Sequence, residues 1–285
     1  MAHTYAAVPE ADEYTVDGGS VTFASQSAAQ TALKLAVLES VSRRIDQAAR
    51  RSQYGSGFGP RIGTNYYDGD NTNTLLLQDD LQSLTAFTVA TTVNGTTVSP
   101  APTTDYFLGD SQGYTGPPYR RVVLHQRGTP TIFYRDFHVV TMTGTWGQSN
   151  VSLPNATTCT GLSASTTATT FTTSATPTIY AGNTILVDSE QMYVQSVAGT
   201  TATVVRGANG TTAAVHVNGS AISVYSYDSR VHEVAMRLYK GRWRARQASG
   251  DGSDAALDGI AFAPREGEDT IIRRGLGDLV LLGTY

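Results

Sequence analysis

Two stretches with helical hydrophobic periodicity enclose a long region of strand-like sequence, and this arrangement limits the folds open to the chain. In residues 27–51, the apolar side chains from Leu33 to Ala49 recur every three or four positions and would share one helix face. Ser27 and Gln30 fit a capping box at the start of this helix. The periodicity returns in residues 229–246. We therefore expect two amphipathic helices with a β-rich region between them.

The region between the two helices falls into two parts. Residues 61–147 contain short strand-like runs separated by turn residues, which predicts a small antiparallel sheet. Residues 150–227 begin with a stretch rich in threonine, serine and alanine and continue with short strands such as Thr184–Val187. A threonine-rich stretch is compatible with a linker or with exposed strands. We expect an inserted all-β module in this second part.

These patterns predict an α+β fold: two amphipathic helices with a small antiparallel sheet, an inserted all-β module and extended terminal arms. A chain of 285 residues is long enough to bury a core. The expected boundaries are an N-terminal arm at 1–26, a core at 27–149 and 228–250, the β module at 150–227, and a C-terminal arm at 251–285.

The composition argues against several classes of protein. The formal net charge of -4 argues against a general nucleic-acid binder. No apolar run is long enough to span a membrane, and no secretory signal is visible, so we expect synthesis in the cytoplasm. Cys159 is the only cysteine, which excludes an intramolecular disulfide and disfavours a cysteine-based metal site.

Sequence motifs for catalysis are mostly absent. The chain has no phosphate-cradling glycine loop, no nucleophile elbow and no paired-histidine zinc helix. The histidines, at positions 3, 125, 138, 216 and 232, are scattered, and we expect structural roles for them. Asp188 and Glu190 would share a strand face, as a glycoside hydrolase pair could, but this spacing also occurs by chance. We expect a protein without enzymatic activity, cofactor or metal.

Basic residues gather on the second predicted helix. Between residues 230 and 246 there are six basic residues and one acid, Glu233. Arg230, Arg237, Lys240 and Arg244 line one face. This basic face is either solvated, or it contacts an acidic neighbouring subunit or the phosphates of DNA passing nearby.

The C-terminal segment is rich in apolar residues. Its end contains the apolar stretch Leu279-Val280-Leu281-Leu282. Such side chains at the end of a soluble chain must be buried, either in the core of the chain itself or against a partner. The sequence leaves both alternatives open.

The order of the motifs resembles the head-to-tail adaptor (connector) family of tailed bacteriophages. The similarity rests on the helix that closes on Arg43–Asp46, on residues 64–89, on residues 104–147 with their glycine–tryptophan strand ending, and on the helix Val231–Arg246. In the family, that strand normally runs within a few residues into the second helix. Here about 80 residues intervene, and they are similar to a small β module common in phage virion proteins.

The resemblance implies a structural virion protein at the neck of the particle: a ring of about twelve subunits beneath the portal that joins capsid to tail. Tail-completion or stopper proteins would attach below, and genomic DNA would pass through the lumen. By analogy with the family, residues 271–285 would form the portal-binding arm. Its contact residues would be Ile271, Ile272, Leu276, Leu279, Val280, Leu281, Leu282 and Tyr285. The alternative is a capsid decoration or minor tail protein whose β module binds a glycan or a partner; the module contains Tyr180, Tyr193, Tyr225 and Tyr227 but no tryptophan.

Overall fold

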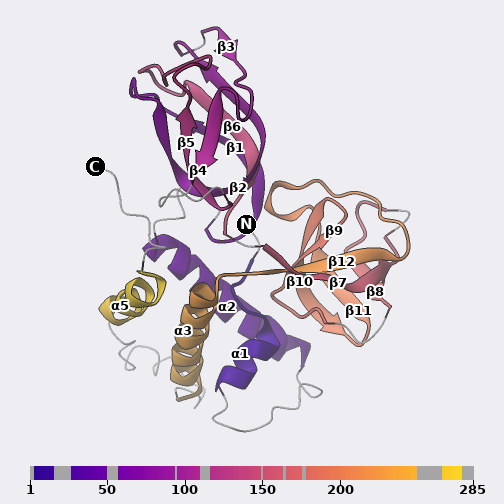
Figure 1. Cartoon of the computed structure of the whole chain (residues 1–285). Helices are drawn as coiled ribbons and strands as arrows, with labels where there is room; N and C mark the ends of the chain where they lie inside the picture. The colour runs from indigo at the N-terminus through magenta and orange to yellow at the C-terminus, as the bar shows by residue number, and fades with distance from the viewer. Residues whose placement is uncertain are drawn as a thin grey trace. The chain divides into compact units, whose positions relative to one another are not determined.

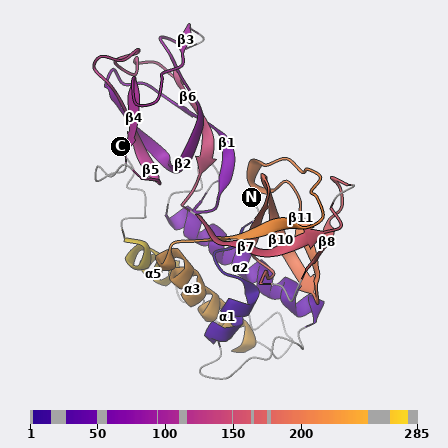
Figure 2. The same cartoon turned by 45° about the vertical axis from the view of Figure 1, so that its right-hand side comes forward.

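The computed structural model describes two compact units, one formed by residues 1–59 and 149–285 and the other by residues 60–148. Figure 1 and Figure 2 show the helices and strands of both units from two directions. The described residues are 3–15, 27–49, 57–93, 95–109, 116–148, 150–162, 165–174, 178–248 and 265–277.

The unit of residues 60–148 is a six-stranded antiparallel sheet with the order β1-β6-β2-β5-β4, in which β3 pairs with β2. Its core is a single cluster that includes the fully buried Leu81, Met142 and Trp146. The strands are β1 (Arg61–Tyr67), β2 (Thr74–Ala90), β3 (Thr97–Val98), β4 (Tyr106–Gly109), β5 (Tyr119–Leu124) and β6 (Val140–Trp146).

The glycine–tryptophan ending of β6 joins three strands of this sheet. A side chain at Gly144 would collide with the Ser83 carbonyl oxygen of β2, so glycine is needed for this close approach. Trp146 is fully buried, and its Nε1 donates to the Gly63 carbonyl oxygen of β1 at 2.9 Å. The motif therefore fixes how β1, β6 and β2 meet.

Residues 150–226 form a closed six-stranded barrel with the order β10-β11-β8-β7-β12-β9. Apolar side chains such as Ile185, Val194 and Ile222 fill its interior. The first and last strands pair with each other and place Asn150 opposite Ser226, so the chain enters and leaves the barrel at neighbouring positions. The strands are β7 (Asn150–Thr160), β8 (Thr170–Thr173), β9 (Thr184–Val187), β10 (Glu190–Ala198), β11 (Thr201–Val205) and β12 (Ser220–Ser226).

Helices pack beside the barrel in the same unit. They are α1 (Val8–Thr15), α2 (Ala28–Ala48), α3 (Ser229–Ala248) and α5 (Arg265–Leu276). The predicted capping box of α2 is confirmed: the Ser27 hydroxyl accepts from the Gln30 N–H, and the Gln30 side chain accepts from the Ser27 N–H. Helix α2 contacts α3 and β10, and α3 also contacts α1 and α5 (Figure 1).

Within the described part of the chain, no helix combines the length and apolar character needed to cross a membrane.

The predicted fold class is wrong. Among the described residues, 37% lie in strands and 27% in helices, and these residues form a six-stranded sheet, a closed barrel and four helices. The expected terminal arms contain α1 and α5. These helices lack a long apolar stripe: α1 buries Val8 and Ala11, and α5 buries Ile272 and Leu276. Such short helices depend on tertiary packing, which local periodicity does not reveal.

The unit boundaries also run differently from the expected domain boundaries. Helices α2 and α3 belong to the same unit as the barrel, whereas the expected core joined them to the sheet. One reason is that α2 faces the barrel: Tyr193 of β10 donates from its hydroxyl to Glu39 of α2 at 2.8 Å.

Replacing Leu276 with alanine should lower the free energy of unfolding of the unit formed by residues 1–59 and 149–285 by about 2–5 kcal/mol, because this side chain is fully buried between the helices. Urea unfolding followed by circular dichroism at a helical wavelength measures the effect. Ile271→Ala is the matched control: this side chain is 39% exposed, so the change should stay below about 1 kcal/mol. Equal effects of the two substitutions would contradict the packing of α5.

Candidate functional site

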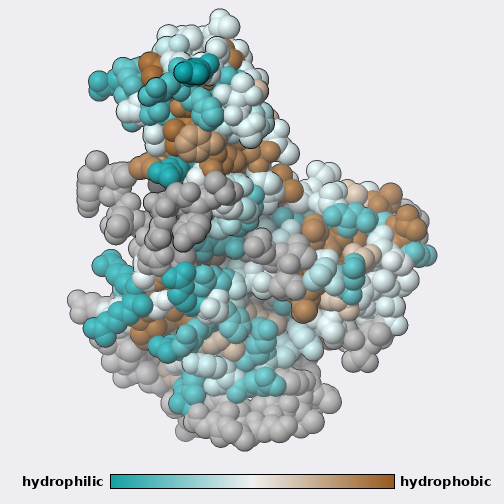
Figure 3. All heavy atoms as spheres, viewed as in Figure 1, coloured by the Kyte–Doolittle hydropathy of each residue, from teal (hydrophilic) through white to brown (hydrophobic). Residues whose placement is uncertain are grey.

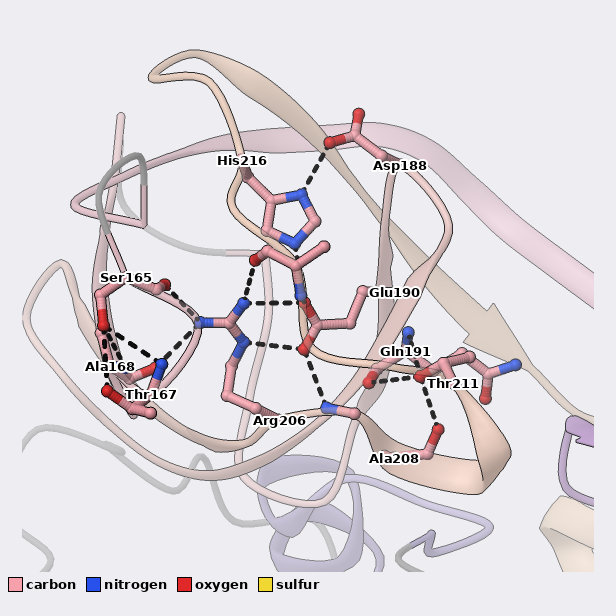
Figure 4. A network of polar contacts seen from close by, with 12 residues as sticks. Ser165, Thr167, Ala168, Asp188, Glu190, Gln191, Arg206, Ala208, Thr211 and His216 are labelled. Carbon is pink, nitrogen blue, oxygen red and sulfur yellow. Dashed lines mark hydrogen bonds and ion pairs between the residues drawn. The ribbon is translucent and has the colours of Figure 1, made fainter.

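Four ionisable side chains form a polar network inside the barrel unit (Figure 4). Asp188 lies in the turn that joins β9 to β10, and Glu190 is the first residue of β10. Arg206 directly follows β11, and His216 lies in the segment that leads to β12. The network therefore joins the turn between β9 and β10 to both ends of the connection between β11 and β12.

The centre of the network is an ion pair between Arg206 and Glu190. Arg206 donates from Nε and Nη2 to the two oxygens of the Glu190 carboxylate at 2.7 and 2.8 Å, which is the bidentate geometry that suits a guanidinium. The side chains are 6% and 0% exposed. Arg206 also donates from Nη1 to the Ala168 carbonyl oxygen at 3.0 Å and from Nη2 to that of Ala214. The guanidinium thus holds two neighbouring segments of backbone.

Glu190 accepts further hydrogen bonds from the backbone. The N–H groups of Gly207 and Ala214 donate to its carboxylate at 2.8 and 2.9 Å. Burial alone would raise the pKa of the Glu190 carboxyl, but the hydrogen bonds from Arg206, Ala214, His216 and Gly207 outweigh burial and lower this pKa to about 2. The carboxylate therefore stays ionised across the physiological range.

His216 lies between the two carboxylates of the network. Its Nδ1 is 2.7 Å from Asp188 Oδ2, and its Nε2 is 2.8 Å from Glu190 Oε2. An ionised carboxylate only accepts, so both contacts are hydrogen bonds when both ring nitrogens carry a proton. The imidazole is 1% exposed, whereas the Asp188 side chain is 60% exposed. His216 thus connects the buried ion pair to a carboxylate at the surface.

The network fixes the course of residues 207–219. Gly207 and Asn209 both adopt positive φ angles, of 58° and 55°. Asn209 Nδ2 donates to the Gln191 side chain at 3.1 Å, and the Thr211 hydroxyl donates to the Ala208 carbonyl oxygen at 2.8 Å. Buried networks of this kind specify one conformation, because every alternative leaves a charge unpaired. The arrangement therefore holds a loop in place.

Glu190, one of the two carboxylates weighed as a hydrolase pair, does not have the electrostatics of a general acid. A general acid of a glycoside hydrolase needs a raised pKa so that it carries a proton at the working pH. Glu190 has a lowered pKa and is buried under Arg206, and Asp188 is hydrogen-bonded to His216. The geometry assigns both carboxylates to positioning the loop.

The predicted basic face of α3 is partly paired with acidic and aromatic side chains. Arg230 donates to Asp228 at 3.1 Å, Arg237 contacts Glu233 at 2.5 Å, and Lys240 Nζ lies 5.4 Å from the centre of the Tyr14 ring. Arg244 is exposed and also has an interaction partner. Hydrophilic residues gather over α3 and α5 in Figure 3. The positive charge counted from the sequence is therefore offset in part by neighbouring acids.

The structure divides the predicted portal-contact residues into two groups. Ile272 and Leu276 are fully buried in the helical core of their own chain, and Ile271 is partly exposed on α5. The remaining residues, Leu279, Val280, Leu281, Leu282 and Tyr285, lie outside the described residues. The burial of Ile272 and Leu276 in the core of their own chain does not fit the portal contact predicted for them, and their role is corrected to core packing.

The remaining reactive groups occupy structural positions. Cys159 is buried in the barrel core, and burial raises the pKa of its thiol, which disfavours the nucleophilic thiolate. His3 is buried beside Tyr5, and burial lowers the pKa of its imidazole. Within the described residues, no group of three or more histidine, cysteine, aspartate or glutamate side chains could hold a metal ion.

Sequence reasoning missed Arg206 as the centre of the network. A signal was available, because Arg206 is the only lysine or arginine between residues 150 and 227. A single cation in a module with so few charges is a strong candidate for a buried pair with one of its two carboxylates.

Comparisons with protein-family profiles, with curated proteins and with solved structures give no match to this chain.

Glu190→Gln should lower the free energy of unfolding of the unit formed by residues 1–59 and 149–285 by about 3–5 kcal/mol, because it leaves the Arg206 guanidinium buried without its counter-ion. Chemical unfolding monitored by near-ultraviolet circular dichroism measures the change. The exposed Asp188 supplies the control: Asp188→Asn should cost about 1 kcal/mol or less. A large loss in the control together with a small loss in Glu190→Gln would refute the central role of the ion pair.

The stabilisation from Glu190 should depend on pH. Its folded-state pKa of about 2 lies below the ordinary value of 4.5, so its contribution is complete above the ordinary value and is lost as pH falls through the folded-state value. The difference in unfolding free energy between the wild type and Glu190→Gln should therefore shrink between pH 4.5 and about 2. A difference that stays constant over this range would contradict the assignment.

Proposed function

We propose that this chain is a structural virion protein of a tailed bacteriophage, a subunit of the head-to-tail adaptor ring that docks beneath the portal and joins capsid to tail. The ring would have about twelve subunits, held together by head-to-tail interfaces that close by rotation. Tail-completion or stopper proteins would bind below it, and genomic DNA would pass through its lumen.

The observation that carries the proposal is how the barrel is inserted. The resemblance to the adaptor family is interrupted between the strand that ends at Trp146 and the helix that begins at Ser229. The barrel strands that bound this interruption pair with each other, with Asn150 opposite Ser226. A module whose two ends are neighbours can be added to an existing fold without separating the elements on either side. Insertion of the barrel therefore explains why this chain has a long stretch between the strand that ends at Trp146 and the helix that begins at Ser229.

The segments that resemble the family also form coherent structures. Residues 61–146 make one antiparallel sheet, and the two helices at 28–48 and 229–248 pack against each other. Within the described residues, β1 and β4 are the outer strands of the sheet path, and each pairs with only one other named strand. An extended segment of a neighbouring subunit could add to such an edge, which is one way to form a head-to-tail interface in a ring.

The location of the protein in the particle tests the proposal. Antibodies against the purified chain should label the neck of the tailed phage particles that contain it, as seen by immunogold electron microscopy. Native mass spectrometry of the ring should give about twelve times the subunit mass of 30.3 kDa. Labelling of the capsid lattice or the tail tip would refute the adaptor role and favour the decoration or minor tail protein.

Removing residues 278–285 should leave the protein folded but unable to join portal-containing heads. The truncation keeps Ile272 and Leu276, which complete the helical core, and removes the predicted portal-contact residues beyond Gly277. Co-sedimentation with purified heads measures docking, and circular dichroism checks the fold. Removing residues 265–285 is the comparison: it should impair folding as well, because it deletes α5. Normal docking by the shorter truncation would refute the role of the C-terminal residues.

A further inference from the structure

The imidazole of His216 joins two carboxylates, and its two contacts depend on its protonation state. The ring is 1% exposed and lies between Asp188 and Glu190 (Figure 4). Its Nδ1 is 2.7 Å from Asp188 Oδ2, and its Nε2 is 2.8 Å from Glu190 Oε2. Ionised carboxylates only accept, so both contacts are hydrogen bonds only while the ring carries two protons. Loss of one proton must therefore open one contact.

The surroundings of Glu190 decide which nitrogen of His216 keeps its proton. Glu190 Oε2 also accepts from Arg206 Nη2 at 2.8 Å and from the Ala214 N–H at 2.9 Å. The Glu190 side chain is 0% exposed, so it cannot turn away to water. A bare Nε2 would direct its lone pair at this fixed, negatively charged oxygen, which is repulsive. Nε2 therefore retains its proton, and Nδ1 loses one.

The contact with Asp188 is the one that opens. The Asp188 side chain is 60% exposed, so its carboxylate can exchange the imidazole for water. Asp188 lies in the two-residue turn between β9 and β10, with a φ of 50°. Residues other than glycine rarely adopt this left-handed backbone, and they keep it where neighbouring contacts support it. The lost hydrogen bond therefore removes a restraint from a strained turn.

The other ionisable groups that the structure places around His216 hold their charge near neutral pH. The pKa of the Glu190 carboxyl is about 2, and an arginine guanidinium is always protonated. Cys159 interacts electrostatically with Asp188 and Arg206, but burial raises the pKa of its thiol above the ordinary value of 9.0. Histidine side chains ordinarily change their charge between about pH 5 and 8. A change of charge in this network over that range therefore belongs to His216.

We propose that His216 is a pH-sensitive latch between the β9–β10 turn and residues 211–219. With two protons, the imidazole ties Asp188 to Glu190. When the Nδ1 proton passes to water, the tie to Asp188 opens and Nε2–H stays on Glu190. The latched segment presents Val215 and Val217, which are 57% and 78% exposed, on either side of His216. The latch lies within one chain, so it is independent of the place of the protein in the virion.

NMR of the full chain, labelled with nitrogen-15, tests the proposal. The His216 ring, assigned by its absence in His216→Gln, should carry two protons at about pH 5.5 and be the Nε2–H tautomer at about pH 8.5. Amide hydrogen exchange, corrected for intrinsic rates, should rise about fivefold over this range at residues 187–189 and 216–219. The Ala214 N–H donates to Glu190 in both states and should not change.

Asp188→Asn separates the latch from other effects of pH. An asparagine side chain has both a donor and an acceptor, so it can pair with Nδ1 in either protonation state of the ring. Exchange at the same residues should then differ by less than about twofold between the two pH values. Ser189→Ala is the matched control, because Ser189 is exposed in the same turn and should keep the wild-type dependence.

Three results overturn the proposal. The first is a neutral His216 ring in the Nδ1–H tautomer, and the second is wild-type exchange that does not change between the two pH values. The third is an Asp188→Asn variant that keeps the wild-type rise, because the change would then come from another group. The first two come from the wild-type chain and do not depend on the folding of a variant.

Discussion

The N-terminal segment of residues 3–8 holds the barrel and the helices together, and most features of the larger unit depend on it. Thr4 donates from its hydroxyl to the Gly182 carbonyl oxygen at 2.7 Å, next to β9. Tyr5 donates from its backbone N–H to the Ser42 hydroxyl of α2 at 3.1 Å. A Cβ atom at Gly182 would lie 2.7 Å from the Thr4 hydroxyl oxygen, so glycine is required where the segment crosses. The Tyr5 ring also packs edge-on against Tyr227, which directly follows β12, at a centroid distance of 4.9 Å.

Local sequence patterns predicted individual elements better than their assembly. The bounds expected for Thr184–Val187 are those of β9, and the capping box at Ser27 is present. The buried face of strand β1 could not be predicted from the sequence, because its burial runs against its hydropathy: Ile62 and Tyr66 are exposed while Asn65 is buried. Apolar residues on a surface are common, so hydropathy alone does not decide which face of such a strand is buried. The predicted fold class failed because strand pairing and the docking of short helices are non-local.

The candidate site, too, depends on contacts between distant parts of the sequence, which local patterns do not predict. The spacing of Asp188 and Glu190 was visible in the sequence, but their roles depend on Arg206 and His216, which are brought to them by the closure of the barrel. A buried ion pair contributes little net stability compared with well-packed apolar residues, but breaking one is costly. The network therefore acts mainly by making one conformation of residues 207–219 much more favourable than any other. This explains how a module rich in small, polar residues keeps a defined loop.

Helix α5 gives the C-terminal residues a fixed starting point. Arg242 of α3 makes two hydrogen bonds to Glu268, at 3.0 and 2.9 Å, and Arg44 of α2 donates to Asp269 at 2.6 Å. These ion pairs and the buried Ile272 hold α5 against α2 and α3. They therefore also fix the position of Gly277, which directly follows α5. A segment that starts from a fixed point loses less freedom when it binds a partner. Under the proposed adaptor role, the apolar residues beyond Gly277 would bind the portal from this fixed starting point.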